Sequence, residues 1–174
     1  MLNYGAAAQK LFGYNDTDLA NSVLTEEDQA NATQSVTLEN KQDKGEKGVG
    51  STLVLESNIV LTMYFKNITR DMRAVVTFTD HANAGHTIEV SGEDFVELNG
   101  TSYLGIRVEE LVIADARQLV TCQIYDGETL VDTAIDSVES YAYRAAGPAD
   151  EAVANAVMKF ADSAYAYLHR DETV

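Results

Sequence analysis

The sequence predicts an α+β protein, in which an antiparallel β-sandwich of about seven strands lies between an N-terminal helix and a C-terminal helical hairpin. Residues 51–135 contain short runs rich in β-branched and aromatic residues, separated by turn residues and uninterrupted by a helical pattern. Before and after this stretch, apolar residues recur at helical spacing instead. We therefore expect residues 1–174 to form a single module with three parts, at residues 1–50, 51–135 and 136–174.

The composition excludes several classes of partner. Hydrophobic residues make up 45% of the chain, which is enough for a packed core. The 28 acidic residues outnumber the 12 basic ones and give a net charge of −16, whereas nucleic acids and anionic membranes both require a basic surface. No apolar run is long enough to insert into a membrane. We expect the acidic surface to maintain solubility, with weak calcium sites as the alternative role of its carboxylates.

The N-terminal part is predicted to be helical at first and irregular afterwards. Met1–Phe12 has apolar residues at helical spacing, and Gly13 follows as a stop. Thr25 is a candidate N-cap of a second helix, with acidic residues directly after it. Asn31–Gly50 is polar and rich in Gly and Lys, so we expect a long loop or a mobile excursion. Because Met1–Phe12 lacks an N-cap and a lead-in turn, we also expect that the chain belongs to a longer protein.

The central part is predicted to be all β. Its clearest hairpin joins Leu119–Tyr125 to Thr129–Ile135 through the turn-forming pair Asp126–Gly127. The segment Leu111–Cys122 is similar to the E–F corner of immunoglobulin-like domains, although the corner tyrosine, the partner cysteine and the core tryptophan are missing. The expected architecture is therefore an immunoglobulin-like antiparallel sandwich. The other predicted strands are Thr52–Leu55, Asn58–Phe65, Ala74–Thr79, His86–Val90, Phe95–Leu98 and Tyr103–Val108.

The C-terminal part is predicted to form two helices joined by a tight turn. The first helix has its N-cap at Asp136 or Ser137, and Glu139 stands where it would complete a capping box with Asp136. A proline near the first helical position favours the start of the second helix. The two helices and the break between them are Asp136–Ala145, Ala149–Leu168 and Gly147–Pro148.

The two ends of the chain carry the same kind of helix. Val157–Leu168 and Met1–Phe12 align large apolar residues with large ones and small residues with small ones. We interpret this pattern as a junction helix that recurs between modules. We expect Met1–Phe12 to pack against the C-terminal helices, with Tyr4, Ala8 and Phe12 buried there.

The motifs provide no catalytic constellation. Gly45–Thr52 has the glycine spacing of a phosphate-binding loop, but Ser51 stands where the lysine is required and no strand precedes the loop. His81 and His86 flank a predicted hairpin turn and have no zinc-ligand spacing with Cys122, which we expect to be a buried structural thiol. We therefore predict that the chain has no catalytic residue, no metal and no cofactor.

Tyrosines remain as candidates for ligand binding, because sugar recognition needs an exposed aromatic face and the chain has no tryptophan. Tyr103 and Tyr125 lie near strand ends or turns, so they are the two candidate ligand-binding residues, with core packing as the alternative role of each. The helical tyrosines have core-like spacing and are expected to pack inside; they are Tyr141, Tyr143, Tyr165 and Tyr167.

Several segments of the chain resemble modules of very large secreted or wall-attached proteins of gut Firmicutes, which often carry leucine-rich repeats, dockerins or carbohydrate-active domains elsewhere. The resemblance implies an extracellular parent at the bacterial cell surface, with the neighbouring modules of the same polypeptide as partners, and it implies no activity. The segments that carry it are Met1–Phe12 with Gly13–Ala20, Asp115–Val120, Asp136–Arg144 and Val157–Leu168.

The predicted function follows from these points. We expect a non-enzymatic spacer, stalk or display module of a larger extracellular surface protein. The alternative is a module that binds a carbohydrate or a host protein on the same scaffold. In neither case do we expect nucleic acid or membrane insertion.

Overall fold

The computed structural model describes residues 36–55, 58–146 and 151–170. The predicted helices at Met1–Phe12 and after Thr25, the burial predicted for Met1–Phe12, and the break at Gly147–Pro148 lie outside these residues. By compactness the chain divides into two units, namely residues 40–141 and residues 1–39 together with 142–174. In sequence, the first unit is therefore an insertion within the second.

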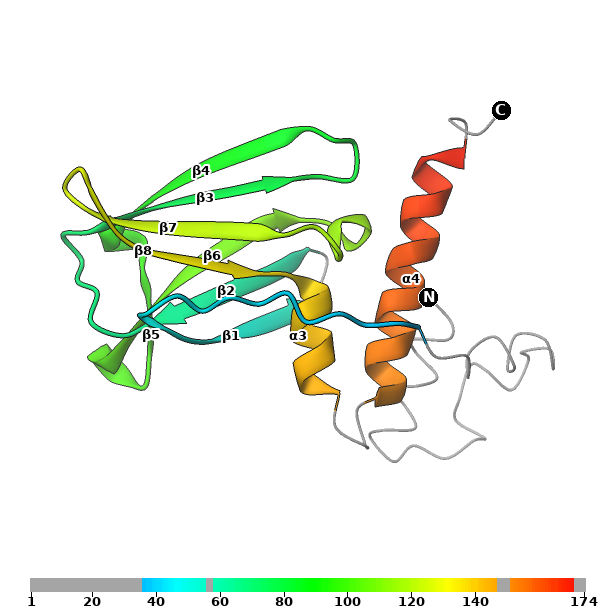
Figure 1. Cartoon of the computed structure of the whole chain (residues 1–174), viewed down its shortest axis with the longest axis horizontal. Coiled ribbons are helices and arrows are strands. Elements are labelled where there is room, and N and C mark those ends of the chain that lie inside the picture. The colour runs from blue at the N-terminus through cyan, green and yellow to red at the C-terminus, as the bar shows by residue number, and fades with distance from the viewer. Residues whose placement is uncertain (1–35, 56–57, 147–150, 171–174) are drawn as a thin grey trace. The chain divides into compact units, whose positions relative to one another are not determined.

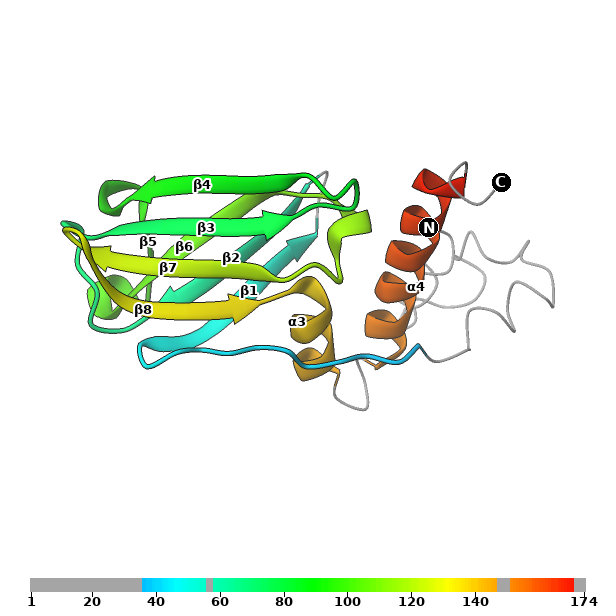
Figure 2. The ribbon, with the colours of Figure 1, turned by 45° about the horizontal axis from the view of Figure 1, so that its top comes forward.

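Residues 40–141 contain an antiparallel β-sandwich. One four-stranded sheet has the order β1-β2-β6-β5 and the other has the order β4-β3-β7-β8. Figures 1 and 2 show the two sheets as separate layers. The prediction of an antiparallel sandwich with helices after it is confirmed. The strands are β1 (Gly48–Leu55), β2 (Ile59–Phe65), β3 (Arg73–Thr79), β4 (Gly85–Ser91), β5 (Val96–Leu98), β6 (Tyr103–Leu111), β7 (Val120–Asp126) and β8 (Thr129–Asp136).

The sheets pack together because alternate side chains of their strands are apolar. In β3, Ala74, Val76 and Phe78 are buried, and the residues between them are more exposed. Each large apolar side chain that is fully buried contributes about 1.5–3 kcal/mol of transfer free energy. The largest fully buried apolar residues of the strands come from both sheets and are Phe65, Leu61, Ile106, Leu111, Ile124, Val76, Val108 and Val120.

Residues 40–47 form a strap along β8, within Asn31–Gly50, where the sequence predicts a long loop or a mobile excursion. Asp43 and Ile135 exchange two backbone hydrogen bonds, of 2.9 and 2.7 Å. The strap is the blue segment that runs beside β8 in both Figure 1 and Figure 2. It leads into β1, which begins at Gly48 and so starts earlier than predicted. For residues 40–47, the long loop is therefore the alternative found, and it is held by partners that lie far away in the sequence.

The helix α3 (Val138–Ala145) follows β8 and begins at a serine cap. The hydroxyl of Ser137 accepts a hydrogen bond from the backbone N–H of Ser140 at 2.9 Å. Of the two predicted caps, Ser137 is therefore the one used. The predicted capping box is wrong, because the backbone N–H of Glu139 donates to the carbonyl oxygen of Ala116 instead of to Asp136. The carboxylate of Glu139 is paired with Arg117.

The helix α4 (Glu151–Leu168) belongs to the second unit. The side-chain Oδ1 of Asn155 accepts a hydrogen bond from the backbone N–H of Val36 at 3.1 Å, which joins the two sequence segments of this unit. In the part of the chain that the structure describes, no helix is long and apolar enough to cross a membrane. The buried residues of α4 recur mainly at helical spacing and are Ala154, Ala156, Val157, Met158 and Ala161.

Most of the helical tyrosines are at the surface. Tyr143, Tyr165 and Tyr167 are 50%, 39% and 65% exposed, so their predicted place in the core is wrong. Tyr165 stacks on His169, with ring centroids 4.0 Å apart, and so covers part of its own ring. In α4 the buried stripe consists largely of small residues one turn or more before the tyrosines, and apolar spacing alone does not distinguish the two stripes.

Candidate functional site

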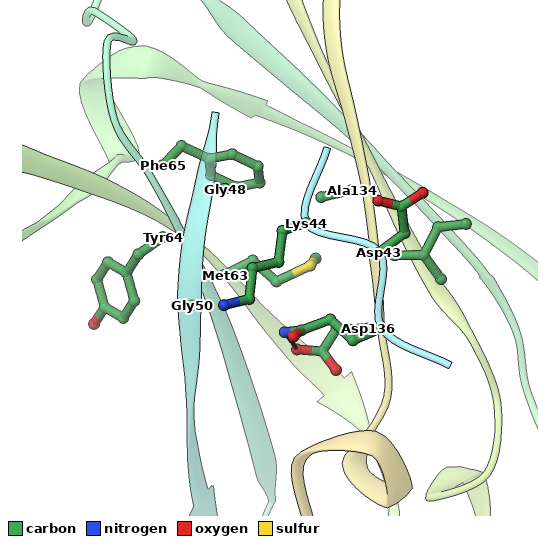
Figure 3. A pocket seen from close by; sticks show the side chains of 11 residues that line it. Asp43, Lys44, Gly48, Gly50, Met63, Tyr64, Phe65, Ala134 and Asp136 are labelled. Carbon is green, nitrogen blue, oxygen red and sulfur yellow. Dashed lines mark hydrogen bonds between the residues drawn. The ribbon is translucent and has the colours of Figure 1, made fainter. Parts of the chain in front are cut away.

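A narrow recess lies between the strap and the edge strands β1 and β8. Its base leaves about 10 Å³ of free space, roughly what a single water molecule needs. Pockets for small organic ligands are far larger, at about 300–1,000 Å³. Figure 3 shows Lys44 of the strap extending toward β1, while Tyr64 points away from the recess. The strap therefore closes this side of the sandwich.

A buried carboxylate, that of Asp136, lies at the recess and is 1% exposed. Its Oδ2 accepts hydrogen bonds from the side-chain nitrogen of Gln42 at 2.9 Å and from the hydroxyl of Ser51 at 2.7 Å. Its Oδ1 accepts a hydrogen bond from the backbone N–H of Ser137 at 2.9 Å. Three donors thus compensate the desolvation of the carboxylate. The group joins the strap, β1 and β8 at one point.

A second buried carboxylate holds the turn at the end of the strap. Asp132 accepts hydrogen bonds from the backbone N–H groups of Glu46 at 3.0 Å and Lys47 at 2.9 Å. Gly45 precedes them with a φ of +63°, and a Cβ at this position would lie 2.4 Å from Oδ1 of Asp132. Glycine is therefore required here both by the backbone conformation and by the close approach.

Two histidines at the β3–β4 turn contact carboxylates. Nδ1 of His81 lies 2.8 Å from Oδ1 of Asp115, which is 2% exposed, and Nε2 of His86 lies 2.8 Å from Oδ2 of Asp80. The predicted turn between the histidines is confirmed. Neither histidine–carboxylate pair was predicted from the sequence. His81 and Asp115 are separated by 34 residues, so no local signal connects them. Among the described residues, no group of three His, Cys, Asp or Glu side chains has the geometry of a metal site.

The two predicted ligand-binding tyrosines lie in different sheets. Tyr103 begins β6 and Tyr125 lies near the end of β7, and both are partly exposed. The guanidinium carbon of Arg73 lies 4.4 Å above the ring centroid of Tyr125, and the hydroxyl of Tyr125 donates to Oε1 of Gln123 at 3.2 Å. The structure does not bring Tyr103 into this group.

Part of the outer face of the sheet that contains Tyr125 is polar. Thr77 in β3 pairs with Thr87 in β4 on one side and with Thr121 in β7 on the other, which gives a row of three threonines across the sheet. In the adjacent rung Gln123 pairs with Val75. We name these residues together with Arg73 and Tyr125 the Tyr125 face. It offers one aromatic ring, a guanidinium, an amide and several hydroxyl groups.

The single cysteine is buried, as the sequence predicts. Cys122 is fully buried in β7. Burial raises the pKa of its thiol to about 12, and the negative charge of Asp132 acts in the same direction. A thiol with such a pKa forms almost no thiolate near neutral pH, and the thiolate is the reactive species. Cys122 therefore serves packing.

Comparison with known proteins gives no match to a family model, to a curated protein or to a solved structure.

Proposed function

We propose that the chain is a non-enzymatic display module of a larger extracellular surface protein, with neighbouring modules of the same polypeptide as its partners. In this role residues 40–141 are the part of the module that presents a surface. The resemblance to modules of large secreted proteins and the acidic composition are consistent with an extracellular setting. The ends of the sandwich unit favour display over a load-bearing spacer.

The observation that carries this proposal is the contact between Lys41 and Ser140. The backbone N–H of Lys41 donates to Oγ of Ser140 at 2.9 Å, although 99 residues separate them. The chain therefore enters and leaves the sandwich unit at neighbouring points. Domains inserted into another sequence commonly have adjacent ends of this kind.

This geometry makes the sandwich a weak load-bearing element. The strap and β8 are antiparallel, and Asp43 pairs with Ile135 close to the points of entry and exit. A force that pulls residues 40 and 141 apart opens the hydrogen bonds between strap and β8 one after another. A spacer under tension needs its terminal strands to be loaded in shear, so that many hydrogen bonds resist together. The sandwich is therefore better suited to presenting a surface than to carrying a load.

The strand order also supports an immunoglobulin-like type of sandwich. The order β1-β2-β6-β5 corresponds to strands A-B-E-D of immunoglobulin domains, and β3-β7-β8 corresponds to C-F-G with β4 in the place of C′. Such domains use one scaffold to present different surfaces, so this assignment agrees with a display role.

Single-molecule force spectroscopy on the full chain tests the proposal. Handles are attached at Asn40→Cys and Tyr141→Cys in one variant, and at Asn40→Cys and Thr129→Cys in the control. The control loads the strap and β8 at opposite ends and therefore in shear. We expect the 40/141 pair to unfold at a several-fold lower force than the 40/129 pair. Equal forces for the two pairs would favour a load-bearing spacer and contradict the display role.

The second candidate function is binding of a glycan or of a host protein on the same scaffold, and the Tyr125 face is the observation that favours it. Sugar rings stack on aromatic side chains, while amide, hydroxyl and guanidinium groups bond to their hydroxyls. Tyr125, Gln123 and Arg73 provide these groups on a single sheet. Tyr103 lies in the other sheet.

A glycan array with the full chain tests this second candidate. Tyr125→Ala should abolish specific binding, and Tyr103→Ala, which removes a partly exposed tyrosine from the other sheet, should leave it intact. Binding that is lost in Tyr103→Ala and retained in Tyr125→Ala would place the ligand elsewhere. An array with no specific signal for the unchanged protein leaves display without glycan binding as the function.

A further inference from the structure

The imidazole of His86 lies between two carboxylates. Its Nε2 is 2.8 Å from Oδ2 of Asp80, and its Nδ1 is 3.6 Å from Oε2 of Glu110. The ring stacks on Phe78, with centroids 4.6 Å apart and an angle of 1° between the planes. Phe78 is buried and pairs with His86 across β3 and β4, so one face of the imidazole packs against a fixed ring.

The protonated ring fits this arrangement better than the neutral ring does. An ionised carboxylate accepts hydrogen bonds and donates none, so each ring nitrogen needs a proton in order to interact favourably with the carboxylate beside it. A neutral imidazole carries one N–H, and its other nitrogen presents a lone pair. If the N–H faces Asp80, which is the closer partner, the lone pair of Nδ1 faces the negative charge of Glu110.

The carboxylate of Asp80 also holds the turn itself. Its Oδ1 accepts hydrogen bonds from the backbone N–H groups of Ala82 at 2.8 Å and Ala84 at 2.9 Å. Asp80 therefore connects the conformation of the turn to the position of His86. A change at the imidazole is transmitted to the backbone of the turn through a single side chain.

The β3–β4 turn contacts strand β6 of the opposite sheet and the segment that follows β6. Glu110 belongs to β6, whereas His86 belongs to β4 of the other sheet. Beside this pair, Asp115 accepts from the backbone N–H of His81 at 2.7 Å and lies 2.8 Å from its Nδ1. The other oxygen of Asp115 accepts from the backbone N–H of Val112 at 3.0 Å. His81 and His86 thus link the β3–β4 turn of one sheet to β6 of the other sheet and to the segment that follows β6.

We propose that the β3–β4 turn is a proton-dependent clasp between the two sheets, closed when His86 is protonated and loosened when it is neutral. The charged groups that face His86 are Asp80 in the turn, Glu110 in β6 and Asp115 beyond β6. The clasp gives the module a response to pH in addition to its display role, and it does not depend on that role.

The direction of the pKa changes agrees with this clasp. The hydrogen bond to Asp80 holds the pKa of His86 above its ordinary value of 6.5, and the charges of Asp80, Glu110 and Asp115 act the same way against partial burial. The hydrogen bond to His86 lowers the pKa of Asp80 from its ordinary value of 3.8. The contribution of the protonated His86 to the free energy of unfolding is complete below pH 6.5, and it is lost as pH rises through the folded-state pKa of His86. The contribution of the ionised Asp80 to the free energy of unfolding is present above pH 3.8, and it is lost as pH falls through the lowered pKa of Asp80.

Nuclear magnetic resonance on the full chain tests the clasp. The ring signals of His86 are titrated, and amide hydrogen exchange in residues 80–86 is compared at about pH 5.5 and about pH 8.5 after correction for intrinsic rates. We expect His86 to titrate above the ordinary histidine value. We also expect amide protection in the turn to be about two- to fivefold greater at the lower pH, as for a partly exposed ion pair.

Three variants distinguish the clasp from a general charge effect. Glu110→Gln should lower the pKa of His86 and reduce the pH difference in protection, and His86→Gln should abolish that difference. Glu109→Gln, the matched control, removes the same charge from the neighbouring position, where Glu109 pairs with Arg107 at 2.7 Å. It should change neither result. Titration of His86 at or below the ordinary value, persistence of the pH difference in His86→Gln, or equal effects of Glu110→Gln and Glu109→Gln would each overturn the proposal.

Discussion

The carboxylate of Asp136 and the hydroxyl of Ser51 are joined by a hydrogen bond of 2.7 Å that crosses from one sheet of the sandwich to the other. Asp136 ends β8 and Ser51 lies in β1, so the bond connects the edge strands of the two sheets. Because Asp136 also accepts from Gln42 of the strap, one buried carboxylate holds three segments. The side of the sandwich at β1 and β8 is therefore held together by polar contacts, whereas its interior is apolar.

Removal of this carboxylate should be costly. Asp136→Ala leaves the donors of Gln42, Ser51 and Ser137 without their partner, and we expect it to lower the free energy of unfolding by about 2–3 kcal/mol. Urea denaturation measures this change. Asp126→Ala, which truncates an exposed aspartate at the end of β7, is the control and should cost less than about 0.5 kcal/mol. A loss as small for Asp136→Ala would show that the network does not stabilise the fold.

The ion pair between Arg117 and Glu139 should contribute more than a surface pair. Glu139 has a side chain that is 2% exposed, while Arg117 is 39% exposed. Arg117→Ala leaves a buried carboxylate with weaker compensation, and we expect a loss of about 1–2 kcal/mol after allowance for solvent around the arginine.

The control for this prediction is the exposed pair of Arg107 and Glu109, whose side chains are 48% and 58% exposed. Arg107→Ala should change the free energy of unfolding by less than about 0.5 kcal/mol. Chemical denaturation at low and high salt compares the two variants. The same small loss for both substitutions would mean that the pair of Arg117 and Glu139 stabilises the fold no more than an exposed ion pair does.

Gly45 and Gly127 provide a matched pair of turn glycines. Both have positive φ, of +63° and +55°, but only Gly45 lacks room for a Cβ, which would lie 2.4 Å from Oδ1 of Asp132 and from the carbonyl oxygen of Thr133. Gly127→Ala should cost about 1–2 kcal/mol, because only the left-handed backbone is strained. Gly45→Ala should cost about 2–4 kcal/mol, since steric overlap is added. Thermal melts measure the difference, and equal midpoints would contradict the close approach.

Cys122 should not react in the native protein. With its pKa raised to about 12 and its sulfur fully buried, it should be modified by a disulfide reagent only when the chain unfolds. The reaction rate with and without denaturant measures this protection, and the denatured protein is its own control because the chain has a single cysteine. Rapid modification under native conditions would show that β7 opens readily.

The strands could be predicted from the sequence to within a few residues. The hairpin of β7 and β8 occupies Val120–Asp126 and Thr129–Asp136, close to its predicted range, but its turn is shifted by one residue: Asp126 pairs with Thr129, so the turn residues are Gly127, at a positive φ, and Glu128. β2 begins one position later than predicted, at Ile59. Alternation of β-branched and polar residues is a local signal, and sheet formation follows it closely.

The strap and the pair of His81 with Asp115 could not be predicted, because their partners are distant in sequence. Residues 40–47 look like a loop from composition alone, yet Asp132, Asp136 and Ser140 hold them through backbone and side-chain hydrogen bonds. His81 is likewise fixed by a carboxylate beyond β6. Local sequence states which groups can bond, whereas the topology decides which of them meet.

The short distance between Lys41 and Ser140 has a consequence for how such a chain can change in evolution. A segment whose two ends meet can be gained, lost or exchanged by recombination without a new connection across the recipient. Here the sequence from residue 40 to residue 141 satisfies this condition, because the backbone nitrogen of Lys41 lies 2.9 Å from Oγ of Ser140. Removal of the segment would require only a short peptide to rejoin the flanks. The sandwich is in this sense a transferable cassette, whose surface can diversify while the flanking sequence stays the same.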